Sequence, residues 1–204
     1  MKKVVVAFIL AGMFAAIVCI FWYQEIQYLL PTPIPKDYHV VIPNEIVQYD
    51  SVLIPQRQAR PKLLHFFDPD CPCSKFNIKH FYSLQRNYKD KIDFFVVVTD
   101  QEKVERAKKL IDTDITILMD SRGMLAKACG VYSTPQAAII QTTNQLYYRG
   151  NYNRARYCTD KKSNFVEMAL DSLVANKKAP YFSDLATRSY GCNLHEEDYI
   201  FDNE

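Results

Sequence analysis

Two cysteines separated by a single residue are the side chains best suited to chemistry in this sequence. Cys71 and Cys73 lie in the run His65-Phe66-Phe67-Asp68-Pro69-Asp70-Cys71-Pro72-Cys73-Ser74, where a predicted strand gives way to a predicted helix. The first backbone N–H groups of a helix are unpaired and carry partial positive charge, so a thiolate placed there is stabilised and its pKa falls. Only the thiolate attacks disulfides, so this location favours redox chemistry.

Two other interpretations of the same pair stay open. The cysteines can be buried and merely structural, or they can bind a soft metal. Two thiolates are an incomplete site for Zn²⁺, whereas Cu(I) tolerates low coordination and His65 would be a third ligand.

The elements that must position these cysteines alternate between strand and helix. Short β-branched or aromatic runs predict strands, and apolar residues on one helical face predict helices. The predicted strands are Leu63–Phe67, Ile92–Val98, Ile115–Met119, Gln136–Gln141 and Gln145–Arg149, and the predicted helices are Ser74–Tyr88, Glu102–Ile111, Met124–Cys129 and Asn164–Ala175. Strands separated by helices indicate parallel pairing, and the last two strands indicate an antiparallel hairpin around Thr142-Thr143-Asn144.

The stretch from Lys62 to Ala175 resembles the thioredoxin-like superfamily. The resemblance rests on the strand, cysteine motif and helix, and on Val131-Tyr132-Ser133-Thr134-Pro135 before the hairpin. It implies an α/β fold with a central mixed sheet flanked by helices. It also implies that Pro135 is a cis-proline facing the active cysteine, and that the backbone of Thr134 faces the substrate. Tyr148–Cys158 and Gly191-Cys192 are similar to an anchored, redoxin-like bacterial group, for which the resemblance implies a fold and a compartment more than a known reaction.

The cysteine motif departs from the Cys-x-x-Cys pattern of the superfamily. If Cys71 matches the nucleophile, Ser74 stands at the place of the resolving cysteine and Cys73 lies one residue early. A Cys71–Cys73 disulfide would close a tight, easily reduced ring. Alternatively, Cys71 works alone or another cysteine resolves it. A peroxiredoxin-like activity is disfavoured, because Asp68 stands where those enzymes carry Thr or Ser.

Charged and titratable neighbours affect the same site. Asp68 and Asp70 oppose thiolate formation, and the helix terminus and Lys75 offset them in part. His65 lies six residues before Cys71, where thioredoxins carry a buried acid. The histidine would transfer protons at neutral pH, or it is a core residue without a catalytic role.

The remaining cysteines are expected to play lesser roles. Cys19 belongs to an apolar run near the N-terminus. Cys129 is expected to stay a buried thiol, with the resolution of Cys71 as its alternative role. We predict a structural disulfide between Cys158 and Cys192, because Cys71 and Cys73 can pair with each other. A disulfide at Cys192 would also hold the C-terminal tail on the domain.

The N-terminus indicates the compartment. An uncharged run from Val4 to Tyr23 follows Lys2 and Lys3, is long enough to cross a bilayer, and ends in the bulky Trp22-Tyr23 instead of a signal-peptidase site. We expect an uncleaved signal anchor over residues 1–23, a Pro-rich tether over 24–61, the thioredoxin-like domain over 62–176 and a tail over 177–204. The stretch Ile46–Ile54 is apolar enough to add a strand or to pack on the domain.

The function predicted from the sequence follows from these features. The chain of 204 residues has a net charge of +2, which gives no reason to expect nucleic acid. We expect a membrane-anchored thiol-disulfide oxidoreductase on the periplasmic or extracytoplasmic side, with a protein or small-thiol partner. Cys71 would attack, Cys73 would resolve, and no cofactor or resident metal is needed. The alternatives are a Cu(I)-binding metallochaperone-like module and a redox-silent binding domain.

Overall fold

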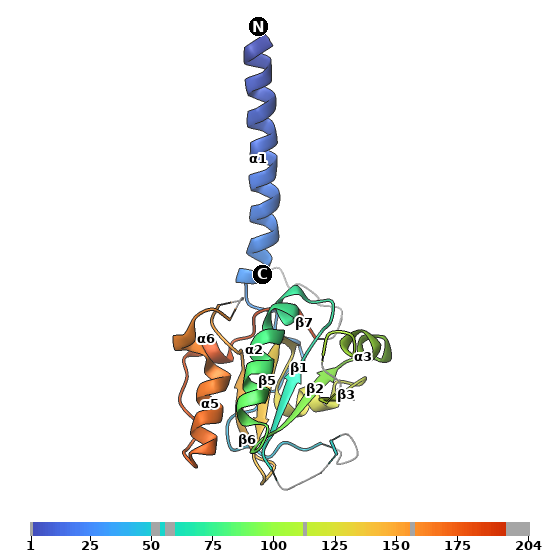
Figure 1. The fold of residues 1–204 in the computed structure, drawn as a ribbon, viewed down its shortest axis with the longest axis vertical. Helices are drawn as coiled ribbons and strands as arrows, with labels where there is room; N and C mark the ends of the chain where they lie inside the picture. Colours follow the sequence, from blue (N-terminus) through green and yellow to red (C-terminus); the bar gives the residue numbers. More distant parts are fainter. Residues whose placement is uncertain (1, 50–53, 56–59, 112–113, 156–157, 195–204) are drawn as a thin grey trace. The chain divides into compact units, whose positions relative to one another are not determined.

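The computed structural model describes residues 2–49, 54–55, 60–111, 114–155 and 158–194 (Figure 1). Two compact units are distinguished, Met1–Pro31 and Thr32–Glu204. The first unit holds one helix, α1 (Lys2–Leu29). Its stretch Lys2–Tyr23 is long and apolar enough to cross a membrane, a property that a membrane anchor and a signal sequence share.

A five-stranded mixed sheet is the centre of the second unit. Its strand order is β3-β2-β1-β5-β6. The strands are β1 (Lys62–Phe66), β2 (Asp93–Val98), β3 (Thr116–Met119), β5 (Gln136–Ile140) and β6 (Leu146–Gly150). The β1–β2 and β2–β3 pairs are parallel, and the β1–β5 and β5–β6 pairs are antiparallel.

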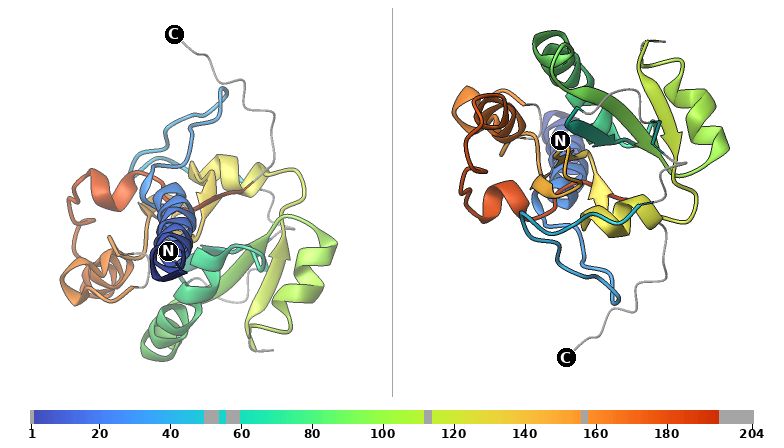
Figure 2. Two further views of the ribbon diagram at one scale, coloured as in Figure 1. Left: turned by 90° about the horizontal axis from the view of Figure 1, so that it is seen from above. Right: turned by 90° about the horizontal axis from the view of Figure 1, so that it is seen from below.

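Helices cover both faces of this sheet. They are α2 (Pro72–Tyr88), α3 (Gln101–Ala107), α4 (Met124–Cys129), α5 (Phe165–Val174) and α6 (Asp184–Thr187), with a 3₁₀ turn η1 (Lys161–Ser163) before α5. Figure 2 shows α2 on one side of the sheet and the segment that begins at residue 32 on the other. The order of these elements and the mixed pairing of the sheet match the α/β fold predicted from the sequence, so the thioredoxin-like fold is confirmed.

The alternation of side chains along β1 explains the two cores. Leu63 and Phe67 face a cluster with Phe81 of α2 and Leu170 of α5. Leu64 and Phe66 face the opposite cluster, which includes residues of α4. Successive residues of a strand point to opposite faces, and all five residues of β1 are buried, as expected for a central strand.

Part of the segment expected to be a tether belongs to the folded unit. Val41, Val47 and Ile54 are buried in the core on the α4 side. Ile46 forms an isolated antiparallel bridge with Gln145, and the Tyr38 hydroxyl donates to the Gly130 carbonyl over 3.0 Å. The tether predicted over 24–61 is therefore corrected: α1 extends to Leu29, and the chain packs on the domain from Thr32 onward. Its apolar residues gain more from burial against the exposed sheet face than from extension in water.

The C-terminal tail contains two elements that sequence periodicity does not reveal. They are α6 and the two-residue strand β7 (Cys192–Asn193), which pairs antiparallel with β4 (Ser133–Thr134). Both lie within the described part of the segment predicted as a tail. In Figure 1, β7 lies at the end of the sheet where α2 begins.

Candidate redox site

Cys71 is the N-cap residue of α2. Its backbone is extended (φ −72°, ψ 119°), Pro72 occupies the first helical position, and the Cys71 carbonyl accepts from Lys75 N over 3.2 Å. Proline suits this position because its fixed φ is helical and its missing N–H would be unpaired there. The sulfur of Cys71 thus lies at the positive end of a 17-residue helix, as the sequence predicted.

Cys71 forms a disulfide with Cys192, and the two Cα atoms are 6.1 Å apart. The predicted Cys158–Cys192 disulfide is therefore wrong, and Cys158 is a thiol. That prediction assumed that Cys71 pairs with Cys73, but Cys73 is not part of a disulfide in this structure. Residues two apart at a helix start do not face each other, and β7 places Cys192 opposite Thr134, where its sulfur bonds to that of Cys71.

Cys158 lies against α2 instead of the tail. Its Sγ is 3.0 Å from Oδ1 of Asn77, to which it donates. Burial, and then the neighbouring Cys73, raises the pKa of the Cys158 thiol to about 12. Cys73 itself is buried within the first turn of α2. Cys73 and Cys158 are thus near enough to affect each other electrostatically, and neither is part of the disulfide.

The Thr134–Pro135 peptide bond is cis, which confirms the conformation that the resemblance implied. The Cys71 Sγ lies 3.7 Å from the carbonyl oxygen of Thr134. Thr134 is fully buried, and its Cα lies opposite that of Cys192 in the β4–β7 ladder. The structure therefore brings Cys71, Thr134 and Pro135 together, although Cys192 occupies the strand position beside them.

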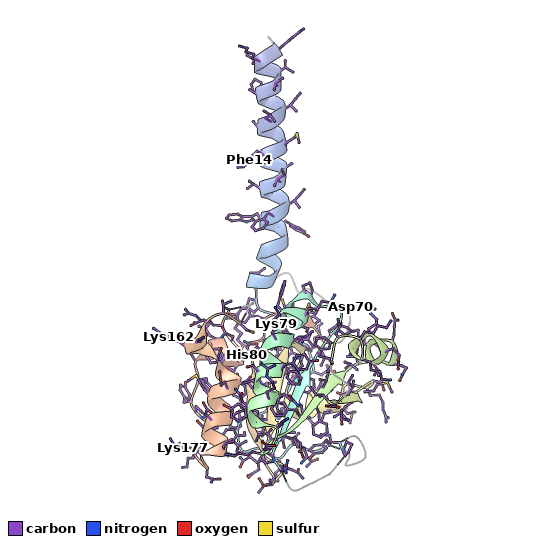
Figure 3. The ribbon with its side chains drawn as sticks, in the orientation of Figure 1. Phe14, Asp70, Lys79, His80, Lys162 and Lys177 are labelled. Carbon is purple, nitrogen blue, oxygen red and sulfur yellow. A yellow bond between two sulfur atoms is a disulfide. The ribbon has the colours of Figure 1, made fainter. Side chains whose placement is uncertain are left out.

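The two acidic residues beside Cys71 are paired with basic residues of α3. Asp68 Oδ2 lies 3.0 Å from Lys103 Nζ, and Asp70 forms an ion pair with Arg106. Asp70 is labelled in Figure 3, at the end of the molecule where α2 begins. The sequence predicted an offset from the helix terminus and Lys75, and it did not predict these two ion pairs. Lys103 and Arg106 reduce the negative potential at the sulfur of Cys71 and so favour its thiolate.

His65 is held inside the core. Its side chain is fully buried, stacks on Phe81, and places Nδ1 2.8 Å from the Tyr152 hydroxyl. Burial lowers the pKa of His65 to about 3. A histidine that stays neutral down to this pH is a weak proton acceptor, so these contacts favour the core role over the proton-transfer role.

The buried histidine makes stability depend on pH. Between about pH 6.5 and pH 3 the unfolded chain protonates His65 but the native protein does not, so stability falls as pH falls. From pH 6.5 to pH 4.5 the expected loss is about 2.3 kcal/mol, because the histidine of the unfolded chain is already half protonated at pH 6.5 and the full slope of about 1.36 kcal/mol per pH unit is reached only below that pH. Urea unfolding of wild type and His65→Gln at both pH values measures it. The variant should lack this share of the loss, and an identical pH dependence of both proteins would contradict it.

Cys129, the last residue of α4, is fully buried in the core and is not part of a disulfide. Burial, and then the Asp120 carboxylate, raises the pKa of its thiol well above the ordinary value. A thiol held protonated in this way is a poor nucleophile. This environment disfavours the alternative that Cys129 resolves Cys71.

The fold, the cysteine at the start of α2 and the cis-proline loop define a thioredoxin-like protein. A family model described as "Domain of unknown function (DUF6436)" matches residues 43–194, and the chain belongs to this family. The matched range includes the Cys71–Cys192 disulfide and the Thr134–Pro135 bond. A search of curated proteins found no match.

Solved structures are similar to this chain at low sequence identity, and the two with TM-scores of 0.63 and 0.60 share its fold. A hypothetical protein from Sinorhizobium meliloti 1021 is 17% identical with a TM-score of 0.63, over 77% of this chain and 96% of that one. An uncharacterized conserved protein from Geobacillus kaustophilus is 18% identical with a TM-score of 0.60, over 83% and 100%. An uncharacterized thioredoxin-like protein from Porphyromonas gingivalis is 17% identical with a TM-score of 0.45, over 62% and 84%.

Sequence reasoning missed Cys192 as the bonded partner of Cys71. The two residues are 121 positions apart, and a two-residue strand gives no periodic signal. The odd number of cysteines outside the apolar N-terminal run was the available hint, since one of them had to fall outside the two predicted pairs.

Proposed function

We propose that this protein is a membrane-anchored, extracytoplasmic thiol-disulfide oxidoreductase in which Cys71 is the nucleophile. The observation that carries the proposal is the disulfide at Cys71, formed at the positive end of α2 and beside the carbonyl of Thr134. A cysteine that leaves as a stabilised thiolate exchanges its disulfide quickly. Thr134 and Pro135 would hold the partner's chain.

The redox couple of this proposal is Cys71 with Cys192. The Cys71 thiolate attacks one sulfur of a partner disulfide, forming a mixed disulfide and releasing the other partner sulfur as a thiolate. The Cys192 thiolate then attacks the Cys71 sulfur, which forms the Cys71–Cys192 bond and releases the second partner thiolate. Two electrons pass from the protein to the partner, and the released thiolates take protons from water.

A reducing thiol partner regenerates the dithiol. Cys71 is only 3% exposed, whereas Cys192 is half-buried, so the donor thiolate would attack the sulfur of Cys192. Cys71 is then the leaving group, which suits its place at the start of α2. A second donor thiol completes the reduction and becomes part of the donor's own disulfide.

Cys73 is the alternative resolving thiol, because it completes the Cys-Pro-Cys motif. Its burial inside the first turn of α2 is less favourable than the position of Cys192, which is already bonded. The Cu(I)-binding alternative has less support, because the Cys71 sulfur is bonded to that of Cys192 and the described residues include no cluster of three or more His, Cys, Asp or Glu side chains that could hold a metal ion.

The direct test is catalysis of disulfide reduction by the full-length protein in detergent. Purified protein should accelerate the reduction of insulin disulfides by dithiothreitol in proportion to its concentration. A rate equal to that without protein would contradict the proposal.

The location is supported by the apolar α1 helix and by the two lysines that precede its uncharged run. With positive charge kept inside, the folded unit would lie outside the cytoplasm, where disulfides persist. Protease added to intact spheroplasts should digest this unit. Protection of the unit until the cells are lysed would place it in the cytoplasm.

A further inference from the structure

The tail strand β7 pairs with β4, directly before the cis-proline. Cys192 lies opposite Thr134 and Asn193 opposite Ser133 in an antiparallel ladder. Leu194 N donates to the Tyr132 carbonyl over 3.0 Å. While Cys71 is bonded to Cys192, the backbone edge beside the cis-proline is therefore occupied by the protein's own chain.

Specific contacts hold the tail in this place. Ser189 accepts through its carbonyl from Thr32 N over 2.9 Å, and its hydroxyl accepts from Gln136 Nε2 over 2.9 Å. The Gly191 carbonyl accepts from the Thr32 hydroxyl over 3.2 Å. Leu194 is 4% exposed and packs in the core on the α4 side. Hydrogen bonds and apolar packing thus hold residues 189–194 in place, and the bonded Cys192 lies within this segment.

Gly191 shows what this strand position excludes. Its φ is +134°, and a Cβ on it would fall well inside contact distance of the Thr134 carbonyl oxygen, a backbone atom. The next nearest neighbour outside Thr134 is the ring of Pro135, 3.6 Å from that Cβ position. The residue before the bonded cysteine must therefore be glycine for the chain to approach Thr134 this closely.

We propose that residues 189–194 are an intramolecular stand-in for the partner, and that the partner is an extended polypeptide with glycine directly before its reacting cysteine. This inference rests on the proposed function. The edge of β4 then pairs at different stages with the partner's chain and with β7. The partner pairs with β4 while its sulfur is bonded to Cys71, and β7 replaces it when Cys192 attacks Cys71 and displaces the partner's thiolate.

The test uses full-length Cys192→Ser protein and two synthetic peptides. One peptide has the sequence of residues 188–194, with its cysteine activated as a 2-thiopyridyl disulfide, and the other has alanine in place of the glycine. The Cys71 thiolate attacks the peptide sulfur, the peptide–Cys71 disulfide forms, and thiopyridone leaves. We expect the glycine peptide to react about tenfold faster, because a misplaced chain costs at least this factor. Mass spectrometry of the product identifies the modified cysteine.

A second variant tests competition by the tail. Gly191→Ala combined with Cys192→Ser should displace β7, so the glycine peptide should react about tenfold faster than with Cys192→Ser alone. Thermal unfolding shows whether this double variant folds. If it does not fold, the rates of the two peptides with Cys192→Ser protein are the test of the inference. Equal rates for the glycine and alanine peptides would overturn the inference.

The small reagent 2,2′-dithiodipyridine separates this failure from failure of the proposed function. Reaction of Cys71 with the small reagent, together with equal rates for the two peptides, would leave Cys71 as the nucleophile and remove the tail as a model of the partner. No reaction of Cys71 with the reagent or with either peptide would overturn both. Faster reaction with the glycine peptide supports both.

Discussion

Replacement of Cys71 by serine is expected to reduce insulin reduction to the uncatalysed background. The loss should be on the order of 100-fold or more, because no other group takes over from a removed nucleophile. A serine hydroxyl is not ionised near neutral pH and does not attack disulfides, although it fits the same N-cap position of α2. The rate of insulin reduction by dithiothreitol, followed with full-length protein, measures the effect.

Cys158→Ser is the matched control for this variant. Cys158 donates to Asn77 through its sulfur, and a serine hydroxyl can keep this hydrogen bond. We expect this control to retain the wild-type rate, since Cys158 is bonded to neither Cys71 nor Cys192. Equal rates for wild type and Cys71→Ser would remove Cys71 from the mechanism.

Asn151→Ala is expected to lower the free energy of unfolding by about 3 kcal/mol, because it leaves several buried polar groups without partners. Asn151 is 6% exposed, and its Nδ2 donates to the carbonyls of Leu185 and Arg188 over 3.0 and 2.6 Å. Its Oδ1 accepts from Gln136 Nε2 over 3.2 Å. The side chain thus connects the residue after β6 to α6 and to the segment that leads from α6 into β7.

Thermal unfolding in detergent measures this effect. For a folded unit of this size the expected fall in Tm is roughly 6–12 °C. The matched control is Asn87→Ala, because Asn87 is an exposed residue of α2 and surface changes of this kind stay within about 0.5 kcal/mol. An Asn151→Ala protein as stable as the control would show that the tail is not held through this side chain.

Local pattern was sufficient to predict most of the fold. The helix expected over Met124–Cys129 has those bounds, and Gly130 ends it in the left-handed conformation that suits glycine. The strand expected over Ile92–Val98 begins one residue later, at Asp93. Each of these elements is long or apolar enough for its own residues to select its structure. The cis bond before Pro135 was predictable only through the resemblance to the superfamily.

The partner of Cys71 was not predictable in the same way, because tertiary contacts decide it. Cys192 reaches the site through α6 and β7, which are four and two residues long and have no amphipathic period. Asn151, Gln136 and Thr32 fix the path of the tail, and these side chains come from distant parts of the sequence. The same holds for Lys103 and Arg106, whose pairing with Asp68 and Asp70 depends on how α3 packs against β2 and β3.

A redox titration of the full-length protein tests the account most directly. Protein equilibrated in glutathione buffers of stepped potential is quenched with acid and alkylated, and each cysteine is then quantified by mass spectrometry. The account predicts that Cys71 and Cys192 become thiols together, without denaturant and with a midpoint above about −300 mV, as expected for an exchanging disulfide. A bond between these cysteines that is reduced only below that potential or only after unfolding, or a Cys71 bonded to a different cysteine, would contradict it.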